Sequence, residues 1–436
     1  MQGRIGIRRE DKDPREKRAP LTPAQVGQLV RTGIVVDVET AQNRAFRDDE
    51  YAQVGANVSE DLSRCNLVLG AKEIPNERIA PDQNYLFFSH TIKGQLYNMP
   101  MLQRILDVRA TLMDYEKVVD AQGRRLIFFG RFAGRAGMVR SLWALGQRLR
   151  WEGLVTPFES IGRAYTYASL DEAKAAVTAV GQEIQRRGLP AGVTPLVCGF
   201  AGYGNVSKGA QEIFDLLPVE TIAPEELEAR VGRGGLSNKS VYKVVFKEEH
   251  CVEPVAPGKP FVLADYYQRP EGYRGRFERN LPFLTLLINA NYWEPQYPHL
   301  VTLAALRELF AQEARLRVIG DISCDVNGAI ECTVETTSFE RPTYVFDPAT
   351  EKIRYGCEGK GPIVLSIDRL PNEFAREATD AFGSGLMPFL PALARLDYKL
   401  PFEKLVLPEP FQGAVIAHRG ALTPAFTYLE TALARA

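Results

Sequence analysis

Residues Thr194–Leu217, TPLVCGFAGYGNVSKGAQEIFDLL, contain an apolar run, a glycine-rich turn and a helical segment in direct succession. The turn follows the dinucleotide fingerprint G-x-G-x-x-G, with a serine in the place of the third glycine. Such a turn allows a pyrophosphate to come close, and the free N–H groups of the following helix attract that anion. The stretch therefore predicts a dinucleotide site, and an ordinary strand-to-helix turn is the alternative. The residues assigned to this site are Gly202, Tyr203, Gly204, Asn205, Val206 and Ser207.

The sequence after the turn bears on which cofactor such a site would bind. An acidic residue about 20 positions further on usually reads the ribose 2′-hydroxyl of NAD. Here Glu220 lies inside the expected second strand, VETIAPEEL (219–227), and Ala223-Pro224 occupies the place where the acid would stand. The missing acid favours NADP(H). NAD(H) is the alternative, because no arginine is placed to bind a 2′-phosphate.

Apolar runs alternate with helical stretches along the whole chain, which is typical of a parallel sheet covered on both faces. The chain therefore has the pattern of an α/β protein. Further strands of the nucleotide-binding sheet are expected in three later apolar runs. Strands of the first third are expected at 4–8, 35–39, 66–72, 85–90 and 111–116, and the later ones at 283–294, 316–331 and 361–371.

Capping signals mark the expected helices. Thr22 precedes a proline and a helical run that Gly33 closes, and Ser169 with Gly188 encloses a second helix. A long helix over 133–153 leads into a second domain. The tail from Phe374 reads as helices with a proline kink, and residues 232–240 read as an exposed loop.

Composition excludes several classes of protein. The chain has 436 residues, of which 45% are hydrophobic and 25% charged, so it is long enough for two domains with cores of their own. A formal net charge of −1 gives no field that would favour nucleic acid or an acidic membrane. No apolar run has the length of a membrane helix, and the first residues lack an apolar signal core. The six cysteines form no CxxC pair and no metal-ligand spacing, which favours a reducing cytoplasm without a bound metal.

Polar side chains follow three of the expected strands. Lys72 comes after NLVLGA, His90 comes after YLFFS, and Asp114 with Glu116 ends TLMDYE. In open α/β sheets ligands bind outside the carboxyl ends of the strands, where these side chains would meet. Lysine and histidine have different pKa values, about 10.4 and 6.5, so together they form a credible proton-transfer pair. Taken alone, Lys72 is better explained as a solvated loop lysine, and His90 is equally well explained as a structural histidine. Glu116 has the alternative of a helix-start carboxylate.

Two arginines are interpreted either as surface charges or as substrate-binding residues. Arg18, in EKRAPLTP, and Arg125, in GRRL, are surface charges if they lie outside a cleft. Inside a cleft they would bind substrate carboxylates through bidentate hydrogen bonds.

An ordered series of motifs resembles the lysine–ketoglutarate reductase domain of the bifunctional α-aminoadipic semialdehyde synthases. The likeness covers nearly the whole chain from about Ile5, and it extends more distantly to lysine-forming saccharopine dehydrogenases and to alanine dehydrogenase. The motifs are REDKDPREKRAPLTP (9–23), LGAKEIP (69–75), FFSHTIKGQ (87–95), DYEKVVDAQGRRLIFFGRFAGRAGM (114–138), GYGNVSKGAQEIFDLLP (202–218) and SIDRLPNEFAREATDAFG (366–383).

The resemblance implies two Rossmann-like domains with parallel sheets and an active site in the cleft between them. Residues 1–132 with 375–436 would form the substrate domain, and residues 133–374 would bind the nicotinamide cofactor. Lys72 matches the family's catalytic lysine, and His90 matches its histidine. The positions that match the substrate pocket of relatives are Arg18, Glu73, Glu116, Arg125 and Asp368.

The activity implied is the condensation of L-lysine with 2-oxoglutarate and reduction to saccharopine, a step of lysine degradation. Partners would be these small molecules, without nucleic acid or membrane, and a homo-oligomer is left open. One rival is an opine-type or amino-acid dehydrogenase acting on another amine or keto acid. A second rival, of a different class, is a non-catalytic sensor that binds nucleotide or lysine, although a sensor has no need of the proton carriers Lys72 and His90.

Overall fold

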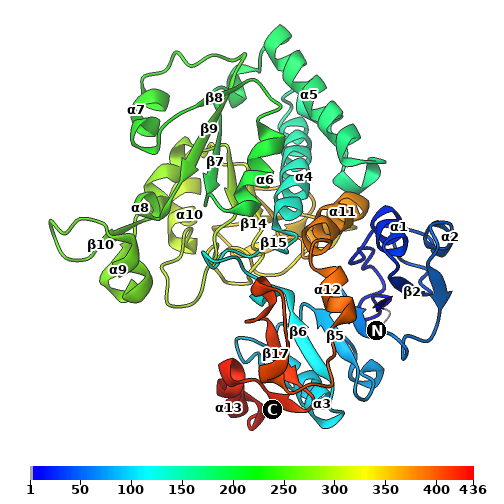
Figure 1. The fold of residues 1–436 in the computed structure, drawn as a ribbon. Coiled ribbons are helices and arrows are strands. Elements are labelled where there is room, and N and C mark those ends of the chain that lie inside the picture. Colours follow the sequence, from blue (N-terminus) through cyan, green and yellow to red (C-terminus); the bar gives the residue numbers. More distant parts are fainter. Residues whose placement is uncertain (1–2) are drawn as a thin grey trace. The chain divides into compact units, whose positions relative to one another are not determined.

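The computed structural model describes residues 3–436, which divide into two compact units. The first unit consists of Met1–Phe129 with Ala375–Ala436, and the second of Gly130–Phe374. Each unit is built around one eight-stranded sheet (Figure 1). Both sheets are parallel except for antiparallel strands at one edge, so the predicted α/β fold with two Rossmann-like sheets is confirmed.

The sheet of the first unit has the order β18-β17-β6-β5-β4-β1-β2-β3. Its six parallel strands thus follow the doubly wound order 3-2-1-4-5-6, in which the chain reverses direction across the sheet between β1 and β4. The strands are β1 Arg4–Ile7, β2 Val35–Glu39, β3 Asn57–Ser59, β4 Leu67–Leu69, β5 Asn84–Phe87, β6 Thr111–Asp114, β17 Val415–His418 and β18 Ala421–Leu422. The helices are α1 Pro23–Arg31, α2 Asp48–Ala52, α3 Met99–Asp107, α11 Ala375–Leu386, α12 Leu390–Arg395 and α13 Glu430–Leu433.

The sheet of the second unit has the order β15-β14-β16-β13-β12-β7-β9-β8. Its strands are β7 Leu196–Ala201, β8 Val219–Thr221, β9 Val241–Phe246, β12 Leu286–Asn289, β13 Val318–Asp321, β14 Tyr344–Asp347, β15 Lys352–Tyr355 and β16 Ile363–Leu365. A small hairpin, β10 Val252–Pro254 with β11 Tyr273–Gly275, stands outside this sheet. The helices are α4 Gly130–Trp151, α5 Leu170–Arg187, α6 Asn205–Phe214, α7 Leu227–Gly232, α8 Glu248–Cys251, α9 Leu263–Gln268 and α10 Leu303–Phe310.

Local signals fix the helix ends as the sequence predicts. The Thr22 hydroxyl caps α1 by accepting from the Gln25 N–H, and the Ser169 hydroxyl accepts from the Glu172 N–H at the start of α5. Gly188 ends α5 with a φ of 77°, in the left-handed region that glycine tolerates best.

Strand order corrects one sequence-based expectation. The segment VETIAPEEL is expected as the second strand of the nucleotide-binding unit, where a ribose would be read, but only its start forms β8, which lies at the sheet edge. The strand beside β7 is β9, since Gly199 pairs with Val244 in parallel register. The end of β9, not of β8, is therefore the place where a ribose would be read.

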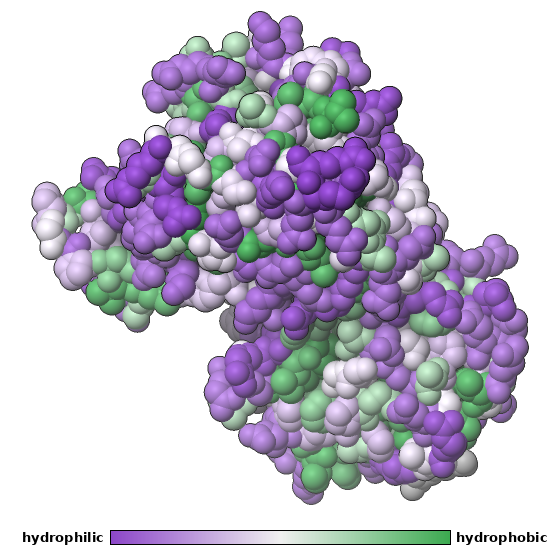
Figure 2. Space-filling model, turned by 90° about the horizontal axis from the view of Figure 1, so that it is seen from above, coloured by the Kyte–Doolittle hydropathy of each residue, from purple (hydrophilic) through white to green (hydrophobic). Residues whose placement is uncertain are grey.

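Neither a membrane-spanning helix nor a cluster of metal-ligating side chains is found within residues 3–436. No helix there combines the length and hydropathy that crossing a bilayer requires. The same residues contain no group of three or more His, Cys, Asp or Glu side chains arranged to hold a metal ion. Hydrophilic residues predominate on the face shown in Figure 2.

Candidate functional site

Four neighbouring strands of the first unit end at one edge of their sheet. Lys72 lies three residues beyond β4, His90 three residues beyond β5, and Glu116 two residues beyond β6. These strands are adjacent and parallel, in the order β6-β5-β4-β1. The structure therefore places all three side chains at the carboxyl edge, beside the point where the chain reverses direction.

His90 is held by a hydrogen bond with Glu73. Its Nδ1 lies 2.8 Å from Glu73 Oε1, and its backbone adopts a φ of 49°. Burial disfavours ionisation of Glu73, but His90 and then Lys12, at 3.0 Å, outweigh it and hold the Glu73 pKa well below its usual range. Because a permanent carboxylate faces Nδ1, that nitrogen carries a proton, and Nε2 is the nitrogen left to exchange protons with a substrate.

Asn98 and Phe88 make the remaining contacts that hold the His90 ring and its backbone. The Asn98 amide donates to the carbonyl of Ser89 at 3.1 Å and reaches Glu73 Oε1 at 3.4 Å. The Phe88 ring stacks on the His90 ring with centroids 6.2 Å apart. The imidazole is thereby fixed in both position and orientation.

Lys72 is half-buried, and a buried carboxylate faces it. Burial works against ionisation of Glu16, but the Arg18 guanidinium and the Lys72 charge outweigh burial and lower the Glu16 pKa. Arg18 binds Glu16 through two hydrogen bonds, of 2.8 Å from Nε and 2.6 Å from Nη2, and stacks over Phe129 at 4.3 Å. Arg18, Glu16 and Lys72 thus form one connected charge cluster.

The remaining predicted residues differ in how accessible they are. Arg125 pairs with Glu116 at 3.3 Å while its side chain stays half exposed, so its guanidinium is open to a substrate anion. Asp368 belongs to the second unit, where Arg369 lies 3.4 Å from its carboxylate. The structure thus gathers six of the predicted residues in the first unit, and Asp368 lies in the other one.

The site has two further buried carboxylates, of which Asp114 was expected at a strand end and Glu10 was not identified from the sequence. Asp114 ends β6, accepts from the N–H and hydroxyl of Ser89, and has a pKa that burial raises to about 6. Glu10 follows β1 and accepts from the backbone N–H groups of Ala71 and Lys72. The only available signal was position after a strand, and in the charged run 8–18 it does not tell which carboxylate turns inward.

The second unit has a groove of about 590 Å³ at the carboxyl ends of its central strands. Gly202 begins the turn at its wall with a φ of 101°, where a Cβ would lie 2.6 Å from Asn291 Oδ1. Gly204 caps α6, and a Cβ there would meet nothing within 4 Å, so the helix N-terminus is open. The groove is lined by Gly202, Tyr203, Gly204, Asn205, Val206, Glu248, Ala290, Asn291, Tyr292, Ile322, Ser323 and Asp325.

Ser207 was predicted to contact the cofactor, but its side chain lies outside the groove. Its side chain is fully buried, and its hydroxyl accepts from the Gln211 amide at 3.0 Å, so it does not line the groove. The close packing that a third glycine usually provides is supplied by Gly209. A Cβ there would lie 2.0 Å from the Arg131 carbonyl oxygen, and one at Gly134 would lie 1.9 Å from the Val206 carbonyl oxygen. These two glycines let α6 pack directly on α4.

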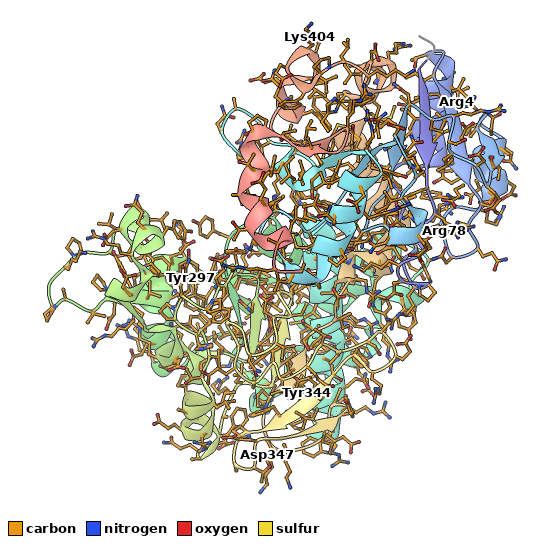
Figure 3. The ribbon with its side chains drawn as sticks, turned by 90° about the horizontal axis from the view of Figure 1, so that it is seen from below. Arg4, Arg78, Tyr297, Tyr344, Asp347 and Lys404 are labelled. Carbon is orange, nitrogen blue, oxygen red and sulfur yellow. The ribbon has the colours of Figure 1, made fainter. Side chains whose placement is uncertain are left out.

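These features fit a dinucleotide. The open N-terminus of α6 and the small Gly202–Gly204 turn suit a pyrophosphate. Glu248, just past β9, lines the groove and also a second hollow of about 220 Å³. Aromatic side chains that suit a flat ring line this hollow, among them Tyr266, Tyr267, Trp293 and Tyr297, the last labelled in Figure 3.

Comparison with known proteins agrees with this architecture. Residues 6–136 match the family model described as alanine dehydrogenase/PNT, N-terminal domain. An L-alanine dehydrogenase structure shares the fold with a TM-score of 0.58 at 19% sequence identity, over 99% of both chains.

Two curated relatives extend the likeness. The chain is 41% identical over 443 residues to alpha-aminoadipic semialdehyde synthase of Arabidopsis thaliana, covering 98% of this chain and 41% of the relative. It is 28% identical over 398 residues to saccharopine dehydrogenase [NAD(+), L-lysine-forming] of Emericella nidulans, covering 89% and 91% of the two chains. The chain therefore spans less than half the length of the synthase it matches. The resemblance inferred from the motifs is confirmed: along nearly its whole length the chain is a homologue of the alpha-aminoadipic semialdehyde synthases and of the lysine-forming saccharopine dehydrogenases.

Proposed function

We propose that the chain is a nicotinamide-dependent oxidoreductase of lysine degradation, which joins L-lysine to 2-oxoglutarate and reduces the product to saccharopine. The first unit would bind the two substrates, and the second would bind the cofactor. The observation that supports this best is the His90–Glu73 pair at 2.8 Å beside Lys72, at the edge of the sheet where such folds bind ligands. The names of the homologues supply the substrate class.

The first chemical steps need proton transfer. The ε-ammonium of the substrate must lose a proton before its nitrogen attacks the keto carbon, and the carbinolamine must then lose water to give an imine. Lys72, in its neutral amine form, accepts the amine proton, and the protonated imidazole of His90 gives a proton from Nε2 to the departing hydroxyl, which leaves as water. When bound, the reduced nicotinamide supplies the hydride that converts the imine to a secondary amine.

Charged side chains of the first unit match the charges of the substrates. The half-exposed Arg125 would bind a carboxylate of 2-oxoglutarate or lysine, and Glu116, its partner at 3.3 Å, would be released to an amine. Arg18 is almost fully buried against Glu16, so it would act mainly by orienting that carboxylate toward Lys72.

A substrate panel tests the proposed reaction. NADPH and NADH oxidation would be followed with lysine, ornithine or alanine as the amine and 2-oxoglutarate or pyruvate as the keto acid. The lysine and 2-oxoglutarate pair should be fastest, with a product of saccharopine mass. Faster turnover with another pair would identify an opine-type or amino-acid dehydrogenase, and cofactor binding without turnover on any pair would identify a sensor.

The cofactor choice that we propose is NADP(H) over NAD(H). Lys247 directly follows β9, and its side chain is 56% exposed, with the nearest carboxylate, Glu249, 3.9 Å away. It is thus available to a 2′-phosphate. Glu248 supports the alternative, because a carboxylate lining the groove can accept from a free 2′-hydroxyl.

Lys247→Met distinguishes the two cofactors. It should raise the KM for NADPH roughly tenfold, the lower end of what a charge-assisted hydrogen bond contributes, and leave the KM for NADH unchanged. Lys239→Met, in the exposed loop before β9, is the matched control and should alter neither value. An unchanged NADPH KM in Lys247→Met, with a lower KM for NADH than for NADPH in the wild type, would favour NAD(H).

Gly202→Ala should weaken cofactor binding by at least tenfold. Its Cβ would lie 2.6 Å from Asn291 Oδ1 and would hold a φ of 101° that L-residues avoid, at a cost of about 1–3 kcal/mol. Gly234→Ala, with a φ of 69° and open space around it, has comparable backbone strain away from the groove. Fluorescence titration with NADPH should therefore separate the two variants, and equal affinities would show that the turn does not hold the cofactor.

A further inference from the structure

Glu10 stands at the point where the first sheet reverses direction. It follows β1 by three residues, and β4, which leads to Lys72, is the strand that pairs with β1 on the side away from β2. The Gly70 N–H still donates to the Leu86 carbonyl at 3.0 Å, as the ladder requires. The next two N–H groups, of Ala71 and Lys72, leave the sheet and need another acceptor.

The Glu10 carboxylate accepts from both of these groups. Its Oε1 lies 2.7 Å from the Ala71 nitrogen, and its Oε2 lies 3.0 Å from the Lys72 nitrogen. An ionised carboxylate accepts at both oxygens, whereas an amide would place a donor against one of the two N–H groups. This contact fixes two successive peptides, so it determines the direction in which the Lys72 side chain leaves the backbone.

The carboxylate is enclosed by other charged or titratable groups. Glu10 is 6% exposed, and the Arg8 guanidinium lies 3.8 Å from its carboxylate. The Glu16 carboxylate acts on Glu10 as a second negative charge. The buried Tyr115 hydroxyl, which Glu10 also affects, has no hydrogen-bond partner among the described residues. Burial chiefly raises the Glu10 pKa, to about 7, with Glu16 adding to it, while Arg8 and the two N–H groups oppose the rise. Burial of an acid at this position is unfavourable for its charged form, and an apolar side chain would fill the same space. The two N–H contacts are therefore the feature that an acid provides here.

We infer that Glu10 is the positioning residue for Lys72: by binding the Ala71 and Lys72 N–H groups it holds the backbone from which the proposed proton acceptor projects. This inference rests on the proposed function, since it requires Lys72 to act in turnover. It assigns no contact with substrate to Glu10 itself.

A double-variant comparison tests the inference. Glu10→Gln keeps the size of the side chain but can accept at only one oxygen, so kcat should fall at least tenfold while the KM for NADPH stays unchanged. In a Lys72→Met background the same change should have no further effect, because the group being positioned is gone. Glu10→Asp keeps the charge and should recover part of the lost kcat. Asp37→Asn, a buried carboxylate of β2 that contacts Arg4 instead, is the control and should leave kcat unchanged.

The outcomes separate this inference from the proposed function. A tenfold fall for Glu10→Gln that is repeated in the Lys72→Met background would overturn the positioning role and show a general structural one. Wild-type kcat in Glu10→Gln with slow Lys72→Met would overturn the inference alone. Wild-type kcat in Lys72→Met would overturn the proton-acceptor role of Lys72 in the proposed function, on which this inference rests. If Glu10→Gln does not fold, Glu10→Asp in both backgrounds gives the same comparison.

Discussion

Lys72→Met should lower the rate of saccharopine formation about 10²- to 10⁴-fold, the range that one general acid or base usually contributes. The methionine fills the space of the lysine stem but cannot take the proton from the amine of the substrate. Lys72 lies in the first unit and the cofactor groove in the second, so the affinity for NADPH should not change. Stopped assays at saturating substrate, with NADPH binding measured by fluorescence, would separate the two effects.

Lys404→Met is the matched control for this variant. Lys404 is an exposed lysine of the same unit, and the same substitution there should leave turnover unchanged. If the Lys72 variant loses NADPH affinity in proportion to its rate, or retains the wild-type rate, the role of proton acceptor is wrong.

Arg140→Met should destabilise the second unit by about 3–5 kcal/mol, because it leaves a buried carboxylate without its counter-charge. Arg140, on α4, donates from Nε to Glu373 Oε1 at 2.8 Å and from Nη2 at 2.6 Å, and both side chains are fully buried. Burial raises the Glu373 pKa while Arg140 opposes the rise, so Glu373 would take up a proton in the variant.

Replacing both partners provides the control. Arg140→Met with Glu373→Leu removes both charges and should recover most of the lost stability, since apolar residues of similar size often replace a buried pair without loss. Urea unfolding followed by circular dichroism would measure the free energy of unfolding of the wild type, of Arg140→Met and of the double variant. Equal losses in the single and double variants would show that packing, not the buried charge, determines stability here.

Much of the fold was predictable because apolar runs and caps are local signals. Ser169 and Gly188 sit at the ends of α5 as expected, and the expected strand at 111–116 contains β6. Strand order is not local: β9, rather than the strand that follows α6 in the chain, pairs with β7. The antiparallel strand β17 was also missed, because it pairs with β6 across some 300 residues of sequence, and no pattern in either segment predicts that pairing.

The same distinction explains which site residues could be found. Lys72 and His90 follow buried parallel strands, so their position alone predicted that they would meet at one edge. Glu10 and Asn98 act through backbone groups and a neighbouring carboxylate. Those contacts depend on the loop conformation after each strand. The composition of the chain and the spacing of its residues do not determine that conformation.

The turnover of the Lys72→Met/His90→Gln double variant tests the central claim most directly, that these two side chains carry the protons of a lysine–2-oxoglutarate condensation. The rate of NADPH oxidation with both substrates should fall at least 100-fold, while NADPH binds with wild-type affinity. A double variant that forms saccharopine at the wild-type rate would contradict the account.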